Sequence, residues 1–141
     1  MIDAMRPYLV TALLLIACTH NNPPFVEGPT AGVEVTVPST LTLRAIDPEG
    51  RPIAYRWLIF DTELGSTDWV ETWEEEEYWY STLTIEQELL NHVAESLLEP
   101  PAEPVVRVAV ADGRANPVIA SWPLPESSVE LAFSESSAGE Q

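Results

Sequence analysis

Two acidic turns hold the side chains of this sequence that are best suited to bind a metal ion. The first spans residues 47–50 (Asp-Pro-Glu-Gly), and the second opens at Asp112. Carboxylate oxygens are ligands that calcium prefers, so Asp47, Glu49 and Asp112 would form a calcium site if the fold placed these turns together. Aspartates in turns also accept hydrogen bonds from their own backbone without a metal. We prefer this simpler interpretation because acidic turn residues are common without a metal. In addition, Arg51 supplies a positive charge that can pair with Asp47 or Glu49 in place of the ion.

A second group of candidates combines aromatic and acidic side chains. Residues 74–77 are four consecutive glutamates, and the aromatic residues around them are Trp69, Trp73, Tyr78, Trp79 and Tyr80. Rings that stack on sugars, beside carboxylates that accept sugar hydroxyls, would form a glycan-binding surface, for which Trp73 and Trp79 are the candidates. In the alternative that we prefer, the aromatic residues fill the core or cover a sheet edge, and the glutamates keep that edge from pairing.

Side chains for catalysis are scarce in this chain. It has two histidines, His20 and His92, a single cysteine, Cys18, and no lysine. Its net charge of -17, from six basic residues against 23 acidic ones, repels nucleic acids and anionic surfaces. We therefore predict a protein that is not an enzyme, does not bind nucleic acid and needs no cofactor, with calcium as the one ion to consider.

The alternation of apolar and polar residues predicts a series of short strands between residues 30 and 125. The clearest alternating segments are 33–37, 41–45, 53–60, 79–85, 105–111 and 118–124. Residues 61–77 are the least regular part, and residues 84–98 change to helical spacing, with Leu89, Val93 and Leu97 on one face. We expect an all-β fold, an Ig-like antiparallel β-sandwich with one short helix inserted before the penultimate strand. Such a sandwich places the turns of Asp47 and Asp112 at the same end.

Three segments within this region resemble bacterial Ig-like domains of the PKD and cadherin-like type. They are residues 45–50 (Ala-Ile-Asp-Pro-Glu-Gly), 53–57 (Ile-Ala-Tyr-Arg-Trp) and 106–113 (Val-Arg-Val-Ala-Val-Ala-Asp-Gly). The resemblance covers residues 24–125 and implies the Ig-like fold. It also implies that the two loops can hold calcium, although Arg51 stands where that family often has a second aspartate. It implies little else about function, because such sandwiches serve many roles.

Cys18 follows an apolar run from Tyr8 to Ala17. A run of about ten residues spans roughly half of a bilayer's hydrocarbon core, which suits a signal peptide better than a membrane-spanning helix. Residues 15–18 (Leu-Ile-Ala-Cys) resemble the lipobox of bacterial lipoproteins. The resemblance implies cleavage before Cys18, acylation of its thiol and new amino group, and, with Thr19 following, the outer membrane in a Gram-negative cell. The alternative is a buried N-terminal strand with a core cysteine.

The sequence is thus expected to comprise four segments. They are a signal peptide (1–17), a tether (18–29), the sandwich (30–125) and an acidic, serine-rich tail (126–141) that we expect to be disordered. The expected function is that of a lipid-anchored protein of the bacterial cell envelope, whose Ig-like domain binds a protein partner or has a structural role. A calcium- or glycan-binding surface module is the first alternative, and a small envelope hydrolase is the second.

Overall fold

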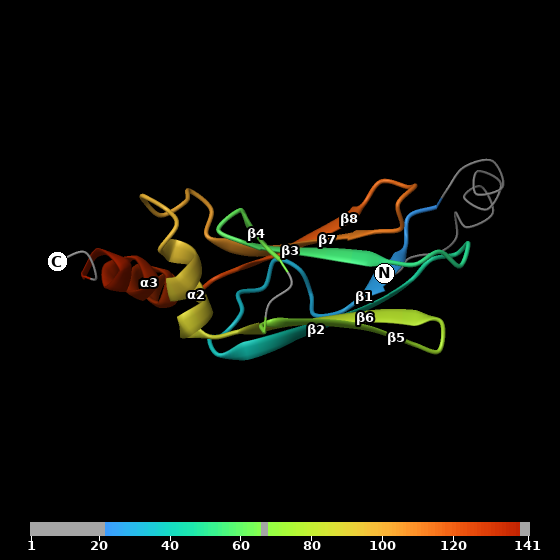
Figure 1. Ribbon diagram of the computed structural model, residues 1–141, viewed down its shortest axis with the longest axis horizontal. Helices are drawn as coiled ribbons and strands as arrows, with labels where there is room; N and C mark the ends of the chain where they lie inside the picture. The colour runs from blue at the N-terminus through green and yellow to red at the C-terminus, as the bar shows by residue number, and fades with distance from the viewer. Residues whose placement is uncertain (1–21, 66–67, 139–141) are drawn as a thin grey trace.

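The computed structural model describes residues 22–65 and 68–138. In this part of the chain, eight strands form two antiparallel sheets that pack face to face, and two helices lie at one end (Figure 1). The predicted signal peptide, Cys18 and the first residues of the predicted tether lie outside the described residues. Neither described helix is long and apolar enough to cross a membrane.

The strand order of the two sheets is that of an Ig-like sandwich. Sheet A has the order β1-β2-β6-β5 and sheet B the order β4-β3-β7-β8, which correspond to strands A-B-E-D and C′-C-F-G of an Ig domain. The strands of sheet A are β1 (Phe25–Glu27), β2 (Ser39–Ile46), β6 (Tyr78–Ile85) and β5 (Val70–Glu75). The strands of sheet B are β4 (Thr62–Leu64), β3 (Ala54–Ile59), β7 (Val105–Ala111) and β8 (Val118–Pro123). The predicted all-β, Ig-like fold is confirmed.

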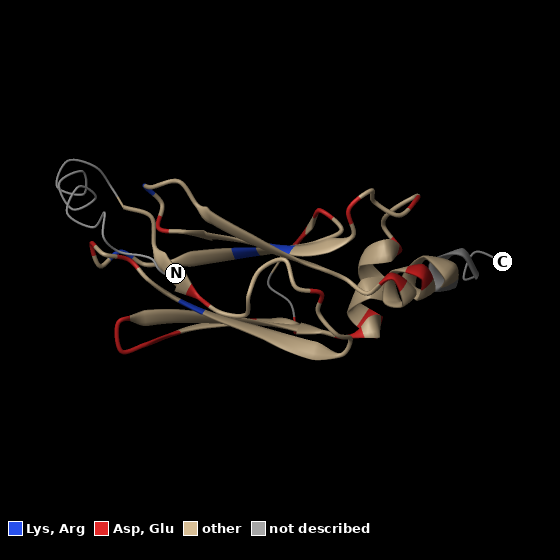
Figure 2. Ribbon diagram, turned by 180° about the vertical axis from the view of Figure 1, so that it is seen from behind, with Lys and Arg blue, Asp and Glu red and all other residues tan. Residues whose placement is uncertain are grey.

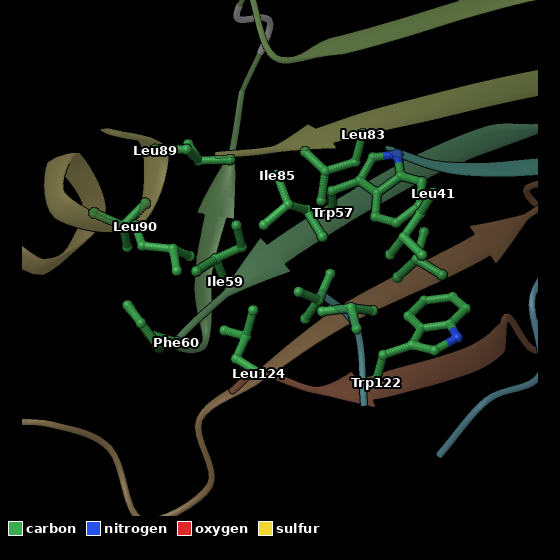
Figure 3. Packing of buried hydrophobic residues seen from close by; sticks show 14 of the residues in the cluster. Leu41, Trp57, Ile59, Phe60, Leu83, Ile85, Leu89, Leu90, Trp122 and Leu124 are labelled. Atoms are coloured by element: carbon green, nitrogen blue, oxygen red, sulfur yellow. The ribbon is translucent and has the colours of Figure 1, made fainter. Parts of the chain in front are cut away.

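The core lies between the two sheets and is built by the predicted alternation. In β7 every second residue is buried, and Trp57 of β3 lies opposite Val108 of β7. The Trp57 ring stacks on that of Trp122 with centroids 6.3 Å apart (Figure 3). Its indole N–H donates to Ser81 Oγ of the other sheet at 2.9 Å. Packing and one buried hydrogen bond thus join sheet A to sheet B.

The helix α2 (Gln87–Ala94) precedes β7, the penultimate strand, as predicted, and buries the face that carries Leu89 and Val93. A second helix, α3 (Glu126–Ala138), forms where the sequence predicted a disordered tail, so that prediction is wrong. Val129 and Ala132 of α3 are buried. The side-chain amide of Gln87 donates to the Ser128 carbonyl at 2.9 Å, which ties α2 to α3.

The start of the domain also differs from the prediction. The sandwich begins with β1, which lies inside the predicted tether and pairs with β2. Residues 33–37, predicted as the first strand, do not form a strand of either sheet but run alongside β8. Two backbone N–H groups hold this segment, that of Gly32 on the Ser121 carbonyl at 2.8 Å and that of Val35 on the Pro123 carbonyl at 3.0 Å.

Residues 61–77, which are irregular in the sequence, contain the two strands β4 and β5, and each is joined to a neighbouring strand by a two-residue hairpin turn. Phe60 and Asp61 connect β3 to β4, and Glu76 and Glu77 connect β5 to β6. All four residues have positive φ, between 53° and 75°. Two-residue hairpin turns of this kind normally contain glycine, asparagine or aspartate, since other residues are strained at positive φ. Asp61 is such a residue, but Phe60, Glu76 and Glu77 are not, and this weak turn signal in the sequence is the reason why β4 and β5 were not predicted.

Candidate functional site

The two acidic turns meet at the end of the sandwich opposite the helices. Carboxylate oxygens of Asp47, Glu49 and Asp112 all lie within 4.8 Å of one another, while Asp47 and Asp112 are buried and Glu49 is exposed. The side-chain amide of Asn22 donates to Glu49 Oε2 at 3.1 Å, so the start of the described chain lies beside this cluster. The prediction that the fold would bring the three carboxylates together is therefore correct in its geometry.

One oxygen of each buried aspartate organises its own turn. Asp47 Oδ2 accepts the backbone N–H groups of Glu49 at 3.0 Å and Arg51 at 2.8 Å. Asp112 Oδ1 accepts those of Arg114 at 2.8 Å and Ala115 at 2.9 Å. This is the role in turns that we preferred from the sequence, and it accounts for half of the hydrogen-bonding capacity of the two carboxylates.

The second oxygen of each aspartate is buried and has no hydrogen-bond partner among the described residues; these atoms are Asp47 Oδ1 and Asp112 Oδ2. The Arg51 guanidinium lies 3.0 Å from Glu49 Oε1 and 3.8 Å from Asp112 Oδ2, at the open side of the cluster. Burial, together with the adjacent Asp112 carboxylate, raises the pKa of Asp47. The hydrogen bond from the Arg114 backbone lowers the pKa of Asp112. Of the two carboxyls, Asp47 is therefore the one that holds a proton more tightly.

The spacing of these oxygens fits a calcium ion. Calcium binds oxygen at 2.3–2.6 Å, so ligands on opposite sides of one ion are about 5 Å apart. Orphaned buried carboxylate oxygens are costly and gain from any cation placed between them. Arg51 already supplies one positive charge, and an ion would share the cluster with that guanidinium.

The second group of candidates lies on the outer face of sheet A. Glu27, Arg44, Tyr80 and Trp73 are aligned across its four strands. The rings of Trp73 and Tyr80 are stacked, with centroids 5.3 Å apart and planes 4° apart. The Arg44 guanidinium lies 4.3 Å from the centre of the Tyr78 ring and donates to Glu27 Oε1 at 2.6 Å. We call Trp73, Tyr78, Tyr80 and Arg44 the outer row.

The structure separates the two tryptophans that the sequence analysis grouped as a glycan site. Trp73 is 38 % exposed on the outer face. Trp79 is half-buried, packs against the core, and accepts the Tyr55 hydroxyl on its carbonyl at 2.6 Å. Strand alternation puts Trp79 on the same, inner face as Ser81. The ring that stacks on Trp73 is that of Tyr80, and Tyr78 in turn packs beside Tyr80.

A third feature is a cavity of about 720 Å³ between β4 and α2. Trp69, Leu89 and Val93 give it an apolar wall, and exposed His92 lies at its rim. His92 is thus a surface residue of α2, as its position in the sequence indicated.

Comparison with solved structures finds Ig domains. One is a chain of the complex between Dpr2 Ig1-Ig2 and DIP-Theta Ig1-Ig3, with a TM-score of 0.47, 16% identity, 74% of this chain covered and 32% of that one. Titin domain M7 gives a TM-score of 0.44 and 11% identity, with 74% of this chain and 93% of that domain's chain covered. The N-terminal Ig1-2 module of the Drosophila receptor protein tyrosine phosphatase DLAR gives a TM-score of 0.41 and 14% identity, with 73% of this chain and 48% of that chain covered. No family model matches the sequence, and no match is found among curated proteins. The fold assignment therefore rests on the strand order of the chain itself.

Proposed function

We propose that this protein is a lipid-anchored, non-enzymatic component of the bacterial cell envelope that binds a protein partner through the outer face of sheet A. The observation that carries the binding role is the outer row, where Trp73 is 38 % exposed on a face with charged neighbours on both sides. Exposed tryptophan, tyrosine and arginine are the residues most enriched at the energetic centres of protein interfaces. Other exposed apolar side chains of the described residues, such as Phe25, Leu98 and Ile119, lie outside the outer row.

The lipid anchor is supported by the sequence around Cys18 and is compatible with the position of the described chain. Residues 19–24 connect Cys18 to β1, so the sandwich would lie within about 25 Å of the bilayer even with this connection fully extended. Asn22 is bonded to Glu49, so the end of the sandwich with the acidic cluster would face the membrane. The helices α2 and α3 would be at the distal end (Figure 1). The outer row would lie nearer the membrane, because Tyr78 begins β6 and Arg44 lies close to the end of β2 on the side of the acidic cluster.

Replacing Cys18 with serine should remove the protein from the membrane fraction or leave it with an uncleaved signal peptide. Serine offers no thiol for acylation, and stable anchoring by acyl chains needs more than one of them. Fractionation and intact-mass measurement of the wild type and Cys18→Ser proteins test this directly. Equal membrane association and equal mass of the two proteins would exclude lipid anchoring.

The binding face can be tested by photo-crosslinking in the native membrane. A photoreactive phenylalanine analogue at position 73 should give a defined covalent adduct with another protein. The same analogue at position 119 should give none, because Ile119 is 55 % exposed but lies on β8 of the opposite sheet. Equal adducts from both positions, or none from position 73, would show that sheet A is not the binding face.

Calcium binding is a second candidate function, favoured by the two orphaned oxygens of Asp47 and Asp112. Calcium at 5 mM should stabilise the wild type by about 1–2 kcal/mol if the dissociation constant is in the range of 10⁻⁴ to 10⁻³ M that is typical of extracellular modules. Asp47→Asn should abolish this response, while Asp68→Asn, an exposed aspartate outside the cluster, should retain it. Thermal unfolding with and without calcium is the measurement. If calcium does not raise the unfolding temperature of the wild type, the aspartates have only a structural role in their turns.

The same variant has a predicted effect of pH without calcium. At pH 7, Asp47→Asn should be more stable than the wild type by on the order of 1 kcal/mol, because the amide can donate a hydrogen bond to Asp112. Burial raises the pKa of Asp47 in the folded state. The wild type therefore loses stability as pH rises from the pKa of an exposed aspartate to this raised pKa, because in that range the unfolded chain releases the proton and the folded chain keeps it. The advantage of the variant should therefore fade as pH falls toward the pKa of an exposed aspartate.

A further inference from the structure

Of the four edge strands in the described sandwich, only β5 is both long and uncovered. The edges β1 and β4 have three residues each. The edge β8 has six residues, but the segment that contains Gly32 and Val35 is hydrogen-bonded along it. The edge β5 also has six residues, and β6 is its one partner strand in the described chain. Its outer side therefore presents unpaired backbone N–H and C=O groups, which can pair with an added strand.

The charge of this edge selects the kind of strand that can be added. Residues 71–77 include five glutamates, three of them in β5 and two in the turn to β6 (Figure 2). The sequence has no arginine or lysine from residue 57 to residue 106. A second copy of β5 would bring like charges face to face, which destabilises strand pairs. A strand with arginine or lysine side chains would instead gain from the same field.

The side chains of β5 provide a place for such a cation. Glu71, Trp73 and Glu75 alternate along the strand and share the outer face, opposite Thr82, Tyr80 and Tyr78 of β6. One face of the Trp73 ring is covered by Tyr80. A shallow hollow of about 460 Å³, lined by Glu71, Thr72 and Trp73, lies at the free side of the strand. An arginine or lysine placed there would stack on the indole and lie between carboxylates.

We propose that β5 accepts an extended, arginine- or lysine-bearing segment of a protein partner as a fifth strand of sheet A, with one cationic side chain on Trp73. This inference rests on the proposed binding role of sheet A and specifies the chemistry of its partner. The backbone hydrogen bonds of the added strand supply affinity, and the alternating Glu71, Trp73 and Glu75 side chains select cationic residues on one face of the segment.

The probe for this proposal is an acetylated nine-residue peptide of alternating arginine and valine, amidated at its end. A matched peptide carries N-methyl groups on the amides of one edge, so it has the same charge but cannot pair as a strand on that edge. Binding of each to the full chain carrying Cys18→Ser is measured by fluorescence anisotropy. The unmethylated peptide should bind and should slow hydrogen exchange of β5 amides, while the methylated one should bind at least tenfold more weakly because several hydrogen bonds are lost.

Variants distinguish specific binding of the peptide at the β5 edge from its general electrostatic attraction to an acidic protein. Trp73→Ala should weaken binding roughly tenfold through loss of the stacked cation. The double variant Glu71→Gln/Glu75→Gln should also weaken it, whereas Glu88→Gln/Glu95→Gln, which removes two exposed charges near α2, should not. Equal binding of the two peptides, or equal effects of the two double variants, would overturn strand addition in favour of nonspecific charge attraction.

The remaining outcomes separate this inference from the proposed function. Crosslinking from position 73 without peptide binding would keep sheet A as the binding face and reject the added strand. Concentration-dependent dimers that Trp73→Ala abolishes would identify a second copy as the occupant, and binding of a chitin or cellulose oligosaccharide in place of the peptide would identify a glycan. Absence of both crosslinking and peptide binding would reject the proposed binding role together with the inference.

Discussion

Ending the chain after Pro125 should lower the free energy of unfolding by about 3–5 kcal/mol, because it removes two large apolar contacts from the core. Val129 of α3 is 6 % exposed, and the Phe133 ring packs against Phe60 with centroids 5.3 Å apart. The truncation also removes the Ser128 carbonyl that accepts the Gln87 amide. Urea unfolding of the truncated and full chains gives this difference as a shift of the midpoint at a similar slope.

Two matched variants separate packing from chain length. A chain that ends after Ala138 should have the stability of the full chain. Phe133→Ala should account for much of the truncation's effect, while Leu131→Ala, at a side chain that is 45 % exposed on the same helix, should change stability by no more than about 0.5 kcal/mol. If the truncated chain is as stable as the full chain, α3 contributes nothing to folding, and the result would support the disordered tail that the sequence predicted.

Replacing Trp57 with alanine should destabilise the domain by about 3–5 kcal/mol, as expected for removing a fully buried aromatic side chain. Trp57 is 1 % exposed and packs on Trp122 in the centre of the sandwich. Its N–H donates to Ser81 Oγ, which in turn donates to the Glu71 carbonyl at 3.1 Å and lies 3.0 Å from the Thr72 hydroxyl. This buried network links sheet B to β5, the strand proposed to bind the partner.

Two further variants divide the Trp57 effect into packing and hydrogen bonding. Ser81→Ala keeps the core volume but leaves the Trp57 N–H buried without its acceptor, at a cost of about 1–3 kcal/mol. Trp73→Ala, at an exposed tryptophan, should cost far less than Trp57→Ala, which also shows that its effect on binding is not an effect on folding. Chemical unfolding of the three proteins is the measurement, and a Trp57→Ala protein as stable as the Trp73→Ala protein would contradict this description of the core.

The sequence alone predicted the parts of the fold in which local pattern and tertiary environment agree. The strand at residues 105–111 matches β7, since alternating valines make a face that only a core can cover. The proline at position 123 is typical of an edge strand or a strand end, and β8, which ends at Pro123, is an edge strand of sheet B. The aspartates of the two acidic turns were recognised because aspartate and glycine mark turns, and the Ig-like strand order then placed the turns at one end.

Tertiary structure decided the secondary structure of those elements whose own sequence predicts it weakly or predicts something else. The strand β4 follows the turn Phe60-Asp61, and β5 precedes the turn Glu76-Glu77. Of these four residues only Asp61 favours positive φ, so strand pairing on both sides imposes this conformation on the other three. The helix α3 has apolar residues at helical spacing, Val129, Ala132 and Phe133, but lies in a serine- and glutamate-rich segment. Such a segment is helical only because it packs against the rest of the domain.

The candidate sites show the same division. Residue type and turn chemistry determined which carboxylates would meet, but only the structure shows that each buried aspartate keeps one oxygen without a partner. The aromatic residues near the glutamates were visible in the sequence, whereas strand pairing decided that Trp73 joins Tyr80 on the outer face and Trp79 enters the core. The prediction for Cys18 remains one from sequence, because a signal peptide is read from its local chemistry and needs no fold. An edge strand open to a partner exists only once every other strand has been paired, so the tertiary structure alone identifies β5.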